Sequence, residues 1–126
     1  MNIKPLALII EDNEDQILVF TKALEAAGYE TETIQDGITA RQRLGEIIPD
    51  IVILDLHIPG INGRELLHQI RSDGRLAEAR VIIATADAAF AERLQTQADL
   101  VLLKPISFLQ LSMLASRYLH HPRSEK

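Results

Sequence analysis

The sequence lacks cysteine and has few aromatic residues, with three phenylalanines and two tyrosines among 126 residues. Without cysteine the chain cannot form a disulfide, a thiolate nucleophile or a cysteine-ligated zinc site. The net charge is −5, and no cluster of lysine and arginine marks a groove that would follow a phosphate backbone. Because aromatic side chains that stack on bases are also scarce, we expect no direct binding of nucleic acid.

Long hydrophobic runs are absent as well. The longest apolar runs have about five residues, far fewer than the roughly twenty that a membrane-spanning helix needs. No signal peptide precedes the first apolar run. Hydrophobic residues make up 47% and charged residues 25% of the chain, which is typical of a soluble globular domain. We therefore expect a single cytoplasmic domain without membrane contact.

Short apolar runs alternate with stretches of helical spacing along the chain. The run at residues 51–54 is unbroken by polar residues, which is typical of a parallel strand buried on both faces. Asn13 is placed to cap the first expected helix, and Gly28 is placed to end it. The expected strands cover residues 6–10, 29–34, 51–54, 81–84 and 100–103. The expected helices cover residues 14–27, 37–48, 64–72, 88–95 and 108–119.

A strand followed by a helix, five times over, predicts an α/β fold with a doubly wound, five-stranded parallel sheet and helices on both faces. Two strand orders are common in such sheets. The order 2-1-3-4-5 places the charged strand 29–34 at an edge and the most apolar strands inside. We expect this domain over residues 1–119, followed by a polar, frayed tail over residues 120–126.

Polar residues stand directly after four of the expected strands, at the end where ligands collect in open parallel sheets. They are Glu11 and Asp12 after the first strand, Asp55 after the third, Thr85 after the fourth and Lys104 after the fifth. Because the first and third strands are neighbours in the order 2-1-3-4-5, the three carboxylates are expected to meet. Each residue alone is readily explained as a cap, a turn residue or a solvated strand end. These explanations do not account for all of the residues standing together at the ends of these strands.

Three carboxylates at one place repel each other unless a cation neutralises them. Oxygen ligands without histidine or cysteine side chains favour Mg²⁺, with Mn²⁺ as an alternative. We expect Asp12 and Asp55 as direct ligands and Glu11 as the partner of a metal-bound water. Lys104 and Thr85 would hold a phosphoryl group by charge and by a hydrogen bond. Asp55 can then act as a carboxylate nucleophile and accept that group.

With these residues, the chain resembles the receiver domain of bacterial two-component response regulators, a CheY-like domain of flavodoxin-like fold, over nearly all of residues 6–119. The residues that carry the resemblance are the acidic pair Glu11 and Asp12, the phosphoacceptor Asp55, the switch hydroxyl Thr85, the turn residues Pro59 and Gly63, and Lys104 before a cis Pro105. The resemblance implies a sensor histidine kinase or phosphotransfer protein as phosphodonor, an effector protein, Mg²⁺, and the backbone carbonyl of His57 as a further metal ligand. It also implies a signalling domain, which catalyses only its own phosphorylation and dephosphorylation, and not an enzyme in the usual sense.

Two departures from the family pattern fall on the face that the family uses for output. Val101 stands where an aromatic residue is usual, and the stretch from Thr85 to Lys104 is about one helical turn short. These changes leave the response to phosphorylation open. Near the site, His57 and Asp87 would either tune the lifetime of the phosphoryl group or be ordinary solvated loop residues.

The last expected helix is apolar beyond a single stripe. The residues expected to face the sheet are Phe108, Leu111, Leu114, Ala115 and Tyr118, which leaves Leu109, Met113 and Leu119 over. An extra apolar surface on a small domain often marks a partner site. The helix therefore either forms a homodimer, or docks a kinase or effector, or has a wide buried face.

Other functions fit parts of the pattern. A pseudo-receiver would serve as a protein-binding scaffold without phosphorylation. A Mg²⁺-dependent phosphatase of the haloacid dehalogenase kind also uses an aspartate after a strand, but it requires a second acid where this chain has His57. Nucleotide binding is disfavoured because no glycine-rich loop follows the first strand. No linker or output domain follows Leu119, so we expect the domain to stand alone, although a piece of a longer protein would give the same sequence.

Overall fold

A central parallel sheet organises the computed structural model, which describes residues 3–120. Its strands are β1 (Leu6–Ile10), β2 (Glu30–Ile34), β3 (Ile51–Asp55), β4 (Arg80–Thr85) and β5 (Leu100–Leu103). All neighbouring pairs are parallel, and the order is β2-β1-β3-β4-β5. The predicted α/β fold and strand order are confirmed, with the charged strand β2 at an edge of the sheet.

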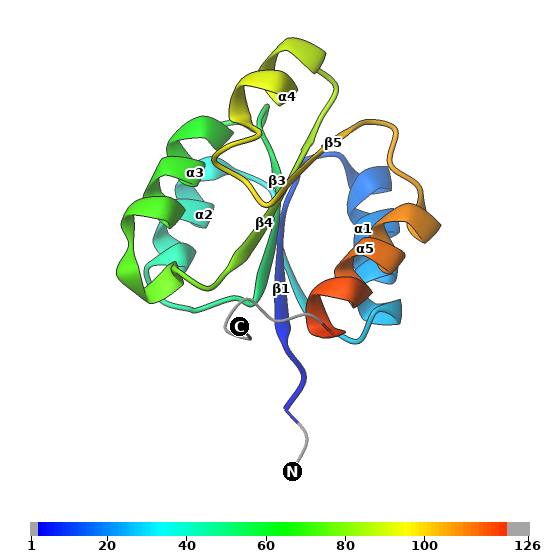
Figure 1. The fold of residues 1–126 in the computed structure, drawn as a ribbon. Coiled ribbons are helices and arrows are strands. Elements are labelled where there is room, and N and C mark those ends of the chain that lie inside the picture. The colour runs from blue at the N-terminus through cyan, green and yellow to red at the C-terminus, as the bar shows by residue number, and fades with distance from the viewer. Residues whose placement is uncertain (1–2, 121–126) are drawn as a thin grey trace.

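Helices cover both faces of the sheet. They are α1 (Glu14–Ala26), α2 (Gly37–Leu44), α3 (Gly63–Ser72), α4 (Ala88–Leu94) and α5 (Phe108–His120), together with a short 3-10 helix, η1 (Gly74–Leu76). Helices α1 and α5 lie on one face, and α2 and α3 lie on the other (Figure 1). Helix α4 packs on the same side as α2 and α3, because its Phe90 and Leu94 join their core. Among the described residues, none of these helices has the length and apolar content needed to cross a bilayer.

The core is divided into two layers by the sheet. Successive side chains of a strand point to opposite faces. In β3, Val52 and Leu54 therefore pack against α2 and α3, while Ile51 and Ile53 pack against α1 and α5. All of these side chains are at most 1% exposed. Burial on both faces is the physical reason why the strand sequence shows no alternation of polar and apolar residues.

Several helix ends differ from the sequence-based prediction. Helix α2 ends at Leu44 and not at Ile48, because Gly45 follows directly and glycine is a poor helix former. Ile48 precedes Pro49, which disfavours helical backbone at Ile48, and its side chain is 60% exposed. The 3-10 helix η1 was not predicted; the Asp73 side chain caps it by accepting a hydrogen bond from the Arg75 amide at 2.9 Å.

The caps of α1 agree with the prediction. The Asn13 side chain accepts a hydrogen bond from the Gln16 amide at 3.0 Å. Gly28 follows the helix with a φ of 107°, a backbone conformation that favours glycine. At the other end of the chain, α5 continues to His120, so the first residue of the expected tail is helical. The remaining tail residues, 121–126, lie outside the described part of the chain.

Helix α5 buries part of its expected face. Leu111 and Ala115 are fully buried against the sheet, whereas Phe108 is 44% exposed, contrary to the prediction. As the first residue of the helix, Phe108 lies at the end of the face whose later residues, Leu111 and Ala115, are buried. Leu109 and Met113 are 64% and 59% exposed and form the extra apolar surface that the sequence suggested, whereas Leu119 is partly buried against the core.

Candidate functional site

Three carboxylates meet at the carboxyl edge of the sheet. Glu11 and Asp12 directly follow β1, and Asp55 is the last residue of its neighbour β3. One oxygen from each of these three side chains lies within 4.8 Å of the others. Asp12 is exposed, while Glu11 and Asp55 are 1% and 4% exposed. The strand order thus joins residues that are more than forty positions apart in the sequence.

Lys104 is the cation of this site. It follows β5, and its backbone amide donates a hydrogen bond to the Thr85 carbonyl at 2.8 Å, which extends the ladder between β4 and β5. The Nζ atom lies 3.0 Å from Glu11 Oε1 and 3.2 Å from Asp55 Oδ2. The peptide bond from Lys104 to Pro105 is cis. One ammonium group therefore bridges two nearly buried carboxylates.

Thr85 ends β4 and is fully buried. The preceding residue, Ala84, is paired with Asp55 in the sheet, so the two strand ends are adjacent. The Thr85 hydroxyl oxygen accepts a hydrogen bond from the Asp87 amide at 3.1 Å. Its own hydrogen remains available for donation to an oxygen at the site.

The site carries more negative than positive charge. Burial, and next the charge of Asp55, raise the pKa of Glu11 from 4.5 to about 7, although Lys104 opposes this shift. Glu11 Oε2 accepts a hydrogen bond from the Asn13 amide at 3.2 Å, whereas the buried Oε1 has its ion pair with Lys104 but no well-oriented hydrogen bond. Clustered oxygens with surplus negative charge suit a hard divalent cation such as Mg²⁺.

Replacing Glu11 by glutamine is expected to raise the free energy of unfolding of the metal-free protein by about 1 kcal/mol at about pH 8. A carboxyl group whose pKa is about 7 in the folded state, against 4.5 when unperturbed, binds a proton more tightly in the folded chain. The stability of the wild type should therefore rise as the pH falls from about 8 to about 5. The stability of Glu11→Gln should lack this rise, because glutamine does not take up a proton. Urea unfolding without metal at both pH values measures the effect. A variant that is less stable than the wild type at the higher pH would contradict it.

His57 lies two residues past Asp55 and contacts helix α4. Its backbone amide donates a hydrogen bond to Asp55 Oδ1 at 3.0 Å. Its ring packs edge-on against Phe90, with 5.8 Å between the ring centroids. The position of His57 two residues after Asp55 is visible in the sequence, but its contact with Phe90 is not, because no local pattern relates a loop residue to a distant helix.

The other residues considered near the site have structural contacts. Asp87 caps α4, since its Oδ1 accepts hydrogen bonds from the Ala89 and Phe90 amides. Val101, at the position where an aromatic residue is usual, is half-buried and packs against the core beneath α2 and α3. Helix α4 has seven residues and is the shortest α-helix of residues 3–120.

Comparison with known proteins gives related sequences and structures. The profile of the response regulator receiver domain matches residues 7–115. The phosphate regulon transcriptional regulatory protein PhoB of Rhizobium meliloti is 34% identical over 124 residues, which cover 96% of this chain and 55% of PhoB. The polar-differentiation response regulator DivK of Brucella anthropi is 35% identical over 81 residues, which cover 64% of this chain and 66% of DivK. The chain thus spans about half of PhoB and just under two thirds of DivK.

Among solved structures, a similar one is the receiver domain of the sensor histidine kinase PA1611 from Pseudomonas aeruginosa, which has a magnesium ion coordinated in its active-site cleft. It has a TM-score of 0.82 and 25% sequence identity, and the match covers 94% of this chain and 99% of that one. The profile match over most of the chain, the relatives that are more than 30% identical and the similar structure of the PA1611 receiver domain agree. The chain belongs to the response regulator receiver domain family.

Proposed function

We propose that this chain accepts a phosphoryl group on Asp55 from a phosphohistidine of a sensor histidine kinase or phosphotransfer protein. The observation that carries the proposal is the position of the Asp55 carboxylate. It lies at the end of β3, between the His57 amide and the Lys104 ammonium and beside two further carboxylates. Membership of the receiver family supports the same assignment.

In the transfer, an Asp55 oxygen bonds to phosphorus while the bond between phosphorus and the donor imidazole nitrogen breaks. The product on this chain is an acyl phosphate, and the imidazole leaves. Lys104, already 3.2 Å from Asp55, would pair with the charge of the phosphoryl oxygens. The Thr85 hydroxyl would donate a hydrogen bond to one of them.

The proposal includes Mg²⁺, or Mn²⁺ in its place. Asp12, Asp55 and the backbone carbonyl of His57 would hold the ion directly, and Glu11 would hold it through a water. When bound, the cation would offset the negative charge of the carboxylates and of the incoming phosphoryl group. The oxygen cluster of the three acidic residues supports this assignment, and so does the magnesium ion in the related receiver domain of PA1611.

Phosphorylation would switch an interaction with an effector protein, so that the chain acts as a signalling domain and not as a metabolic enzyme. The exposed apolar side chains near the start of α5 are candidates for this contact, or for a homodimer, and comprise Leu103, Phe108, Leu109 and Met113. The proposal also places this protein in the cytoplasm. Residues 1–119 would form the functional unit.

Incubation with acetyl phosphate and Mg²⁺ should add one phosphoryl group to the wild type, as measured by intact-protein mass. Asp55→Asn should gain none, because it lacks the nucleophilic carboxylate, and EDTA should prevent the gain in the wild type. Asp36→Asn is a matched control, since this carboxylate caps α2 and is not part of the carboxylate cluster. The absence of any gain in the wild type would contradict the proposal and favour a phosphorylation-independent scaffold.

A further inference from the structure

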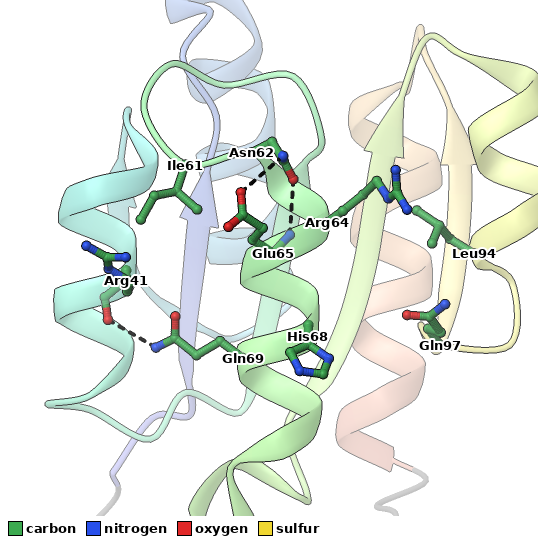
Figure 2. Close-up of a pocket in the computed structure, with 9 residues that line it drawn as sticks. All are labelled: Arg41, Ile61, Asn62, Arg64, Glu65, His68, Gln69, Leu94 and Gln97. Atoms are coloured by element: carbon green, nitrogen blue, oxygen red, sulfur yellow. Dashed lines mark hydrogen bonds between the residues drawn. The ribbon is translucent and has the colours of Figure 1, made fainter.

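A groove of about 660 Å³ runs beside the exposed face of α3 and lies apart from the carboxylate cluster. Figure 2 shows its lining side chains, which come from α2, from α3 and from the region of α4. Those that the groove offers to a ligand are Arg41, Arg64, His68, Gln69, Leu94 and Gln97. Gln69 is held in place by a hydrogen bond from its Nε2 to the Arg41 carbonyl at 3.1 Å.

The arginines on this side of the molecule differ in their partners. Three of those outside the groove pair with carboxylates: Arg43 with Glu32 at 2.6 Å, Arg71 with Asp99 at 2.9 Å and Arg75 with Asp73 at 3.0 Å. In contrast, Arg41 and Arg64 in the groove form no ion pair with any carboxylate of residues 3–120, and both side chains are exposed. Their charges remain available to a partner.

The groove contains one carboxylate, that of Glu65. This side chain is engaged by Asn62, whose Nδ2 donates to Glu65 Oε2 at 3.2 Å (Figure 2). Asn62 in turn caps α3 by accepting a hydrogen bond from the Glu65 amide at 3.1 Å. The lining therefore carries net positive charge on a chain whose net charge is −5.

Charge is distributed unevenly over the chain. Eight of its eighteen acidic residues lie between Glu11 and Asp36, where Lys22 is the one basic residue. These residues belong to α1, to β2 and to the loops beside them. An acidic partner would be repelled from that part of the chain and attracted to the groove beside α3.

The positive charge continues from the groove toward the Asp55 loop. The guanidinium groups of Arg64 and Arg93 lie 5.6 and 5.7 Å from the centre of the Phe90 ring. The ring holds both cations without neutralising them. Since Phe90 also contacts His57, a ligand in the groove would lie beside the loop that follows Asp55.

We propose that this groove docks an acidic segment of a partner protein along α3. Guanidinium groups pair with carboxylates through two parallel hydrogen bonds, which suits Arg41 and Arg64 at the two sides of the helix. The amides of Gln69 and Gln97 add hydrogen-bonding groups, and Leu94 adds an apolar contact. Docking here requires no phosphoryl group on Asp55, so it stands independently of the proposed phosphorylation.

A titration of the ¹⁵N-labelled protein with an octaglutamate peptide tests the proposal by amide chemical shifts. The amides of α3, and those of α2 and α4 beside the groove, should shift. Arg41→Glu combined with Arg64→Glu should weaken binding at least about tenfold at low salt. A matched control combines Lys22→Glu with Arg117→Glu, which changes the net charge equally at two exposed positions outside the groove and should weaken binding less than about twofold. An octalysine peptide should not shift the groove amides.

Three results would overturn the proposal: no binding of octaglutamate to the wild type, shifts that map to another surface, or equal weakening in the two double variants. Circular dichroism establishes that both double variants are folded. If the groove double variant does not fold, the wild-type shift map and the affinity of Arg64→Gln for octaglutamate test the proposal instead. Arg64→Gln is expected to fold, because the side chain of Arg64 is exposed and its loss leaves no buried group unpaired.

Discussion

Replacing Lys104 by methionine is expected to lower the free energy of unfolding of the metal-free protein by about 3–5 kcal/mol at about pH 8. Lys104 Nζ lies 3.0 Å from Glu11 Oε1 and 3.2 Å from Asp55 Oδ2, and both carboxylates are nearly buried. Methionine keeps most of the side-chain volume but removes the charge. Two neighbouring carboxylates are then left in the interior without a cation. The resulting loss of stability is larger than the net stabilisation that the ion pairs provided.

The deficit of Lys104→Met should respond to cations and to protons. Mg²⁺ should restore part of the stability, because the metal ion would then neutralise the carboxylate oxygens in place of the lost ammonium group. Lowering the pH toward about 5 should also reduce the deficit, since an unpaired carboxylate can take up a proton. Urea unfolding measures both responses. Lys22→Met is the control, because Lys22 is exposed on α1 and forms no ion pair with residues 3–120. A midpoint for Lys104→Met equal to that of the control would contradict the prediction.

Replacing Gly63 by alanine is expected to cost about 3 kcal/mol of stability and to slow the phosphorylation of Asp55. A Cβ atom at Gly63 would lie 2.5 Å from Leu56 Cα and 2.7 Å from the Asp55 carbonyl oxygen. Both are backbone atoms, so no side chain can rotate away to relieve the clash. The start of α3 would have to move from the end of β3, and Asp55 would move with the strand.

Gly74→Ala provides the matched control. A Cβ atom at Gly74 meets no other atom within 4 Å, so this change should alter stability by less than about 0.5 kcal/mol. Urea unfolding and the rate of mass gain with acetyl phosphate should be measured on both variants. Equal unfolding midpoints for the two alanine variants would show that the loop after Asp55 has more freedom than the contacts of Gly63 indicate.

Much of the fold follows from local patterns in the sequence. The unbroken run Ile51 to Leu54 predicts a strand buried on both faces, and β3 is such a strand. The acidic composition of residues 29–34 predicts an edge strand, and β2 lies at the edge. The end of α2 was predicted wrongly, because the apolar residues Ile47 and Ile48 continue the helical spacing although Gly45 ends the helix.

The sequence by itself also determined which polar residues follow the strands, because chain direction alone puts Asp55 and Thr85 at the same edge of a parallel sheet. Only the tertiary structure decided how deeply each group is buried and which groups touch. The burial of Glu11, the contact of Phe90 with His57, and the division of the arginines into paired and unpaired groups depend on packing between distant segments. Burial and Coulomb energies vary with distances of a few ångströms, which local spacing does not specify.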